Sequence, residues 1–212
     1  MDNHVQPDLR LDEATHTYAH KGRVVPSVTQ VLSSVGVRSN GYWHPVGFDA
    51  QFGDDNAAEF GTAFHKFAAA KLAFRGVVYP AEMEPYVAQF DEFVNDRILT
   101  PLTDEYGNAL IEYPLYHDVY GYCGTPDVIG TTSDRKGVCI VDWKTSTTKG
   151  DHWPLQLAAY AELVKHALGI KVSYCVAVMV GADKYKVIRY DTPAADWPRF
   201  QSCLNIFKMI KE

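Results

Sequence analysis

The feature that most restricts the fold is the run Gly137-Val-Cys-Ile-Val141, which is short, apolar and rich in β-branched residues. Such a run is typical of a strand buried on both faces, at the centre of a sheet. The strand continues directly into Asp142-Trp143-Lys144, which places a charged pair at its end. Because burying charged groups without partners is costly, the pair indicates a position with a function.

The remaining patterns predict an α/β fold with a central mixed β-sheet flanked by helices. Residues 15–25 predict a hairpin that turns at Lys21-Gly22, and Ser27 is the expected N-cap of a short helix after it. Further helices are expected over 54–74, 82–97, 153–168 and 195–211, and strands over 109–117, 121–132, 137–144, 171–180 and 184–191. The early strands can form a meander, and the helix crossover after residue 144 permits a parallel pair.

The length of 212 residues predicts one domain over 1–212. Within it we expect an N-terminal hairpin and aromatic loop over 1–53, a helical part over 54–108 and the sheet core over 109–212. The formal net charge of −6 argues against a protein that coats nucleic acid by bulk charge. It leaves room for a local basic groove, since binding follows the local field.

The four cysteines form no CxxC pair and no zinc or iron–sulfur spacing, so we expect reduced, mostly buried thiols. The sequence contains no apolar run of ~18 residues, so no membrane span is expected. The N-terminal stretch lacks the pattern of a signal or transit peptide. The expected location is the cytoplasm.

Two aspartates and a lysine form the strongest candidate site. Asp142 and Lys144 share one face of their strand, because residues two apart in a strand point the same way. Asp127 lies in the preceding apolar segment, and a hairpin would bring it beside Asp142. A hard divalent cation resolves the repulsion between two adjacent carboxylates. A surface strand end and a turn aspartate after Pro126 are the alternative interpretations.

Two helices each carry a pair of polar or small residues one turn apart. Gly61 and His65 share a face of the first long helix, where the glycine allows close approach and the imidazole can bind a metal. Gln156 and Tyr160 share a face of the helix that follows Lys144, so they can face the same cleft. Each pair alone is also compatible with an ordinary surface or amphipathic helix.

In this order, the four features resemble the RecB-type branch of the PD-(D/E)XK nucleases, which shows a GxxxH helix, a GxxD strand, a DxK strand and a QxxxY helix. The matching residues are Gly61/His65, Gly124/Asp127, Asp142/Lys144 and Gln156/Tyr160. The segment 26–32 resembles an N-terminal signature of phage-encoded exonucleases and of the mitochondrial genome maintenance exonuclease. The resemblance implies a restriction-endonuclease-like core.

The resemblance further implies a metal-dependent DNA exonuclease that prefers single strands or ends, in phage-type replication, recombination or repair. His65, Asp127, Asp142 and the carbonyl of Trp143 would hold Mg²⁺ or Mn²⁺, and Lys144 would act on the attacking water or on the developing charge. Flanking cysteine ligands are lacking, so no iron–sulfur cluster is expected. For a phage-encoded chain the location is the host cytoplasm, with DNA as partner and replication or recombination proteins as further candidates.

By the same resemblance, Gln156, Tyr160, Ser27 and Thr29 are the expected nucleic-acid contacts. Lys66, Lys149, Arg135 and Lys136 are candidate phosphate contacts, Tyr42, Trp43 and Trp153 could stack on bases, and Glu112 could be an outer-shell acid. An endonuclease on the same core and a non-catalytic binding module are the competing hypotheses. A histidine-based metallohydrolase is excluded by the lack of HxH or HExxH spacing.

Overall fold

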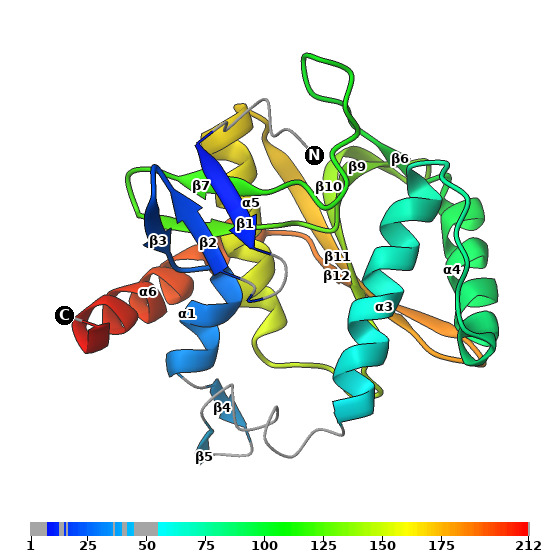
Figure 1. Cartoon of the computed structure of the whole chain (residues 1–212), viewed down its shortest axis with the longest axis horizontal. Helices are drawn as coiled ribbons and strands as arrows, with labels where there is room; N and C mark the ends of the chain where they lie inside the picture. Colours follow the sequence, from blue (N-terminus) through cyan, green and yellow to red (C-terminus); the bar gives the residue numbers. More distant parts are fainter. Residues whose placement is uncertain are drawn as a thin grey trace.

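The computed structural model of the chain describes residues 8–12, 15, 17–35, 37–39, 42–44 and 55–211 (Figure 1). The predicted α/β architecture, a mixed central sheet flanked by helices, is confirmed. The sheet has the strand order β12-β11-β10-β9-β6. These strands are β6 (Thr100–Pro101), β9 (Val128–Thr132), β10 (Arg135–Lys144), β11 (Val172–Val180) and β12 (Tyr185–Tyr190).

The strand predicted to be central, β10, lies in the middle of the sheet. It pairs antiparallel with β9 and parallel with β11, and β11 pairs antiparallel with β12. The parallel pair is joined by α5 (Trp153–Leu168), the crossover helix that the sequence predicts. That helix ends at Gly169, whose φ of 67° is the left-handed conformation that glycine adopts readily.

Helices cover both faces of the sheet, and alternate side chains of β10 enter different cores. Cys139, Val141 and Trp143 join a core with α3 (Asp55–Leu72) and α4 (Glu84–Arg97). Ile140 joins the other core, built with α1 (Val28–Val35), α5 and α6 (Trp197–Lys211) (Figure 1). Short 3₁₀ turns, η1 (Ala81–Met83) and η2 (Pro193–Ala195), precede α4 and α6.

The predicted strands over 109–117 and 121–132 are shorter in the structure. Only Leu115–His117 forms a strand of the first, β7, which pairs with β8 (Tyr122–Gly124) as a separate hairpin. The second is interrupted between β8 and β9 at Thr125-Pro126-Asp127. Proline has no N–H to donate to a strand ladder, which accounts for the break.

The N-terminal region forms a small sheet of its own. The predicted hairpin is confirmed as β2 (Thr17–His20) and β3 (Arg23–Val25), and an additional strand, β1 (Leu9–Asp12), pairs with β2. Ser27 caps α1 as predicted, because its Oγ accepts the N–H of Gln30 at 3.1 Å and its own N–H donates to Gln30 Oε1 at 3.0 Å.

Part of the segment expected to be an aromatic loop is a hairpin, β4 (Val37–Ser39) and β5 (Tyr42–His44). Phe48, Phe52 and Asp54 lie outside the described residues. The four cysteines are free thiols and three of them are buried, as expected. Among the helices that the structure describes, none combines the length and the apolar character needed to cross a membrane.

Candidate active site

The charged pair at the end of β10 faces α5. Asp142 and Lys144 point to one side of the strand, and the Lys144 Nζ lies 2.7 Å from Asp142 Oδ2. The Trp143 ring points to the other side and packs against Phe90 and Phe93, with ring centroids 4.9 and 5.4 Å away. This anchor on α4 holds the strand end in place. Asp142 is only 1% exposed, so its charge depends on local partners.

Asp127 is beside this strand end, as the predicted hairpin requires. Val128 is paired with Val141 across β9 and β10, and the Trp143 N–H donates a hydrogen bond of 2.7 Å to Asp127 Oδ2. The residue differs from the prediction in one respect, because it lies one position before β9 and not within the strand. Freedom from the ladder lets the carboxylate turn towards the strand end.

The third component comes from α3. His65 Nδ1 lies 3.2 Å from Asp127 Oδ2, so this helix meets the segment that carries Asp127. Gly61 accounts for this approach, since a Cβ added there would lie 3.2 Å from the Thr145 Oγ1 just after β10. The two residues of the predicted GxxxH pair thus have separate tasks, one in packing and one in the polar centre.

Glu112 belongs to the same centre, although the sequence suggested only an outer position. Its Oε1 lies 3.8 Å from His65 Nδ1, and one ligand atom each of His65, Glu112 and Asp127 lie within 4.8 Å of one another. The Glu112 φ of 45° is left-handed, an uncommon conformation for a residue with a side chain. The Glu112 N–H donates to the Asp127 backbone carbonyl at 2.8 Å, which holds this conformation.

No local pattern in the sequence marks Glu112. Its place depends on a loop that returns to Asp127 and on a strained backbone, and such strain gathers at functional sites. The only signal was its position before the segment that carries Asp127.

The pKa values of the ionisable groups reflect the negative charge gathered at this centre. Burial opposes a charge on His65, but attraction to Asp127 and hydrogen bonds to Asp127 and Glu112 raise the pKa of the imidazole to about 11. Burial raises the pKa of Glu112 to about 7, and burial also raises the pKa of Asp142 against the opposing attraction of Lys144. A proton on His65 therefore does part of what a cation would do here.

The donor set fits a hard divalent cation. Carboxylate oxygens from Glu112 and Asp127, with one imidazole nitrogen, suit Mg²⁺ or Mn²⁺, and the imidazole favours Mn²⁺ slightly. Asp142 lies outside this group of three, on the side of Lys144. Its share in the same ion, like that of the Trp143 carbonyl, stays a prediction.

A chain of hydrogen bonds runs from Lys144 into α5. Lys144 Nζ donates to Gln156 Oε1 at 2.9 Å, and Gln156 Nε2 donates to the Tyr160 hydroxyl at 3.2 Å. Gln156 and Tyr160 are both buried, and burial raises the pKa of the Tyr160 hydroxyl well above its usual range. The structure thus brings the predicted QxxxY pair to the lysine, while contact with nucleic acid remains a prediction for both residues.

One of the sequence interpretations is wrong. Trp153 is 3% exposed and its ring centroid lies 5.6 Å from Lys144 Nζ, so it packs beside the lysine and is not free to stack on a base. Arg135 and Lys136 stand at the start of β10, a strand of 10 residues, which at ~3.3 Å per residue is about 30 Å from Lys144. Their contact with phosphate stays a prediction.

The other residues predicted to contact nucleic acid differ in their burial. Ser27 is buried at the start of α1, and its Oγ lies 3.0 Å from Thr29 Oγ1, so both belong to the cap, and their contact with DNA stays a prediction. Lys149 is exposed in the loop after β10. The side chains of Tyr42 and Trp43 lie outside the described residues.

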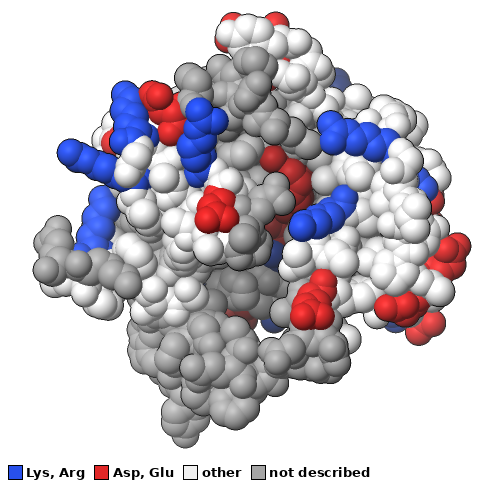
Figure 2. Space-filling model, in the orientation of Figure 1, with Lys and Arg blue, Asp and Glu red and all other residues white. Residues whose placement is uncertain are grey.

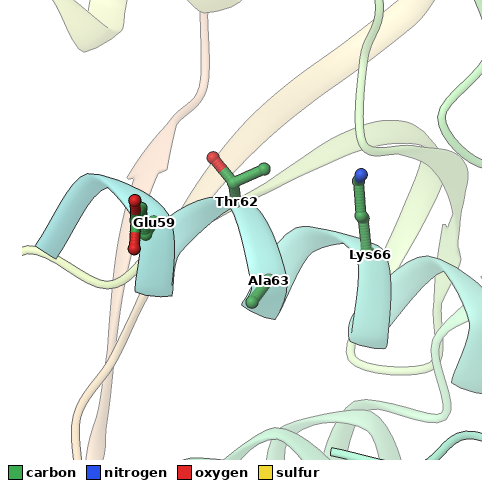
Figure 3. Close-up of a pocket in the computed structure, with 4 residues that line it drawn as sticks. All are labelled: Glu59, Thr62, Ala63 and Lys66. Atoms are coloured by element: carbon green, nitrogen blue, oxygen red, sulfur yellow. The ribbon is translucent and has the colours of Figure 1, made fainter. Parts of the chain in front are cut away.

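Lys66 follows His65 on α3 and lines a pocket on one face of that helix. Glu59, Thr62, Ala63 and Lys66 stand on successive turns there (Figure 3). On the face of the molecule in Figure 2, acidic side chains lie near the centre with lysine and arginine side chains to either side. Basic side chains therefore gather locally on this face despite the negative total charge.

Comparisons with known proteins give distant similarities. No family model and no curated protein matches the chain. Among solved structures, an alkaline exonuclease (LHK-Exo) from Laribacter hongkongensis is similar with a TM-score of 0.43 and 12% identity, over 86% of this chain and 85% of that one. SSO0001 is similar with a TM-score of 0.32 and 13% identity, over 76% and 69%. At these TM-scores neither similarity decides the family or the function.

Proposed function

We propose that the chain is a single-domain, divalent-metal-dependent nuclease that hydrolyses phosphodiester bonds in DNA, and that it acts as an exonuclease on single strands or free ends. The observation that carries the proposal is the meeting of His65, Asp127, Asp142 and Lys144 from separate elements at one end of β10. These residues come from a helix, a break between two strands and a strand end. Packing of the apolar core does not require four ionisable groups to meet there. The resemblance to RecB-type nucleases supports the same reading of these residues.

His65, Asp127, Asp142 and the Trp143 carbonyl would hold the ion, with Glu112 as an added ligand. When bound, Mg²⁺ or Mn²⁺ supplies positive charge that polarises water and the phosphodiester. His65 would bind the ion through Nδ1, the nitrogen that faces Asp127. This nitrogen must lose its proton before the ion can bind.

Lys144 has two candidate tasks, orienting the attacking water or neutralising charge that develops on the phosphate. Its Nζ lies 2.7 Å from Asp142 Oδ2, so the lysine is held beside the carboxylates, and this supports the second task. The Gln156 Oε1 accepts a hydrogen bond from Lys144 Nζ and so orients the lysine side chain. Gln156 and Tyr160 would in addition guide the nucleic-acid strand, as the resemblance implies.

The resemblance to phage-encoded exonucleases supports a role for the enzyme in DNA replication, recombination or repair. It also supports the host cytoplasm as location and proteins of these processes as partners.

The test is cleavage of end-labelled single- and double-stranded DNA, linear and circular, with Mg²⁺, Mn²⁺ or EDTA. Lys144→Ala is compared with Lys171→Ala, an exposed lysine just before β11, whose first residue pairs with Val138 near the start of β10. We expect metal-dependent loss of linear DNA with wild type and Lys171→Ala, and none with Lys144→Ala. Cutting of circles would instead identify an endonuclease. Binding of DNA without cleavage in either metal would refute catalysis and indicate a binding module.

A further inference from the structure

A second group of metal-binding side chains lies at the far end of α5. His117 ends β7, Asp118 follows it in the turn to β8, and His166 is in the last turn of α5. One ring nitrogen of each histidine and one carboxylate oxygen of Asp118 lie within 4.8 Å of one another. His166 is ten residues after Gln156, which corresponds to about 15 Å along the helix. The group is therefore separate from the centre at Asp127.

The imidazole of His117 is buried without ordinary hydrogen bonds. It is 2% exposed, its Nε2 has no hydrogen-bond partner among the described residues, and its Nδ1 receives only a long bond of 3.4 Å from the Tyr120 N–H. Buried polar groups in folded proteins are normally satisfied, so an exception calls for an explanation. Binding of a cation by Nε2 would break no hydrogen bond, and binding by Nδ1 would break only the long bond from Tyr120.

The other two side chains complete a ligand set. His166 Nε2 lies 2.6 Å from Asp118 Oδ1, and the His166 ring is stacked on His117 with centroids 3.7 Å apart and planes 9° from parallel. Ligand atoms on a tetrahedral zinc ion, each at about 2.0–2.2 Å from it, lie about 3.3 Å from one another. The carboxylate must therefore move out slightly and the rings must turn. Asp118 can follow, since its side chain is 70% exposed.

We propose that His117, Asp118 and His166 bind a transition-metal ion, with Zn²⁺ as the ion and water as the fourth ligand. Two imidazoles and one carboxylate suit zinc and its neighbours, whereas Mg²⁺ prefers an oxygen set like that around Asp127. The two sites thus select different ions. Zinc here ties the β7–β8 hairpin to α5, and these elements lead to Asp127 and carry Gln156, respectively.

The test uses tag-free protein stripped with a chelator and then given Zn²⁺ in the presence of excess Mg²⁺. At about 100 times the Kd, we expect Zn²⁺ to raise the Tm of wild type by roughly 5–10 °C. His166→Ala and His117→Phe should lose this rise, and the phenyl ring keeps the aromatic packing. Lys165→Ala, which changes the adjacent residue on α5, should keep it.

A second measurement is the visible spectrum of the protein with Co²⁺ in a His65→Ala background. This variant removes the imidazole at the other centre, so an intense tetrahedral band reports His117 and His166. An equal rise in Tm with Zn²⁺ in wild type and His166→Ala would overturn the proposal. So would the lack of both a rise in wild type and a Co²⁺ band in His65→Ala. Lys144→Ala should keep the zinc response, so failure of this site and failure of the proposed nuclease activity are distinguishable.

Discussion

Gly124→Ala tests whether the packing under Tyr160 controls the active-site lysine. A Cβ at Gly124 would lie 2.7 Å from the Tyr160 Cε1, 3.1 Å from the Val28 Cγ2 and 3.2 Å from the Leu163 Cδ1. Carbon atoms pack comfortably at about 3.5–4.0 Å, so the ring must retreat by about 1 Å. The glycine has no left-handed φ, so the change tests space and not backbone strain.

The retreat of the ring has two expected effects. Overpacking of a buried site costs about 1–3 kcal/mol, and about 2 kcal/mol lowers the Tm of a chain of this size by roughly 4–8 °C. The bond of 3.2 Å from Gln156 Nε2 to the Tyr160 hydroxyl would lengthen beyond hydrogen-bond range, which frees the Gln156 side chain that holds Lys144. A displacement of this size can cost about 100-fold in the rate of cleavage.

The assay is thermal unfolding together with single-turnover cleavage well below the Tm. Gly76→Ala is the matched control, because a Cβ there meets nothing within 4 Å. It should leave the rate unchanged and leave the stability equal or slightly higher, by up to about 1 kcal/mol. A Gly124→Ala variant with wild-type Tm and wild-type cleavage would refute the reasoning from the contact to Tyr160.

Three further predictions concern stability and metal binding. Ser27→Ala removes the cap of α1 and should lower the stability by about 1 kcal/mol in denaturant unfolding, and an unchanged midpoint would contradict the capping role. Gly130→Ala would bring a Cβ to 2.6 Å from the Thr100 carbonyl oxygen, so we expect a loss of at least about 2 kcal/mol in the same assay, and wild-type stability would refute it. Despite its burial, attraction to Asp127 raises the pKa of His65 to about 11, so metal binding should release a proton and the affinity should rise up to about tenfold per pH unit between about pH 7 and pH 9. Calorimetry in two buffers of different ionisation enthalpy checks this, and a heat independent of the buffer would count against it.

The sequence by itself determined the parts of the fold that depend on neighbouring residues. Strand periodicity placed Asp142 and Lys144 on one face of β10, and the apolar run before them predicted a central strand. The first residue of α5 and its end at Gly169, like the cap at Ser27, follow from local hydrogen bonds and local backbone preferences. These signals act over a few residues, so a pattern in the chain is enough to recognise them.

The tertiary structure decided which distant side chains meet. Glu112 enters the centre through a left-handed backbone and a bond to Asp127, and no residue pattern predicts either. The contact between Gly124 and Tyr160 and the burial of Trp153 depend on how α5 lies across the sheet and β8. Such contacts join residues far apart in the chain, and their geometry follows from packing of the whole core, which no local sequence preference encodes.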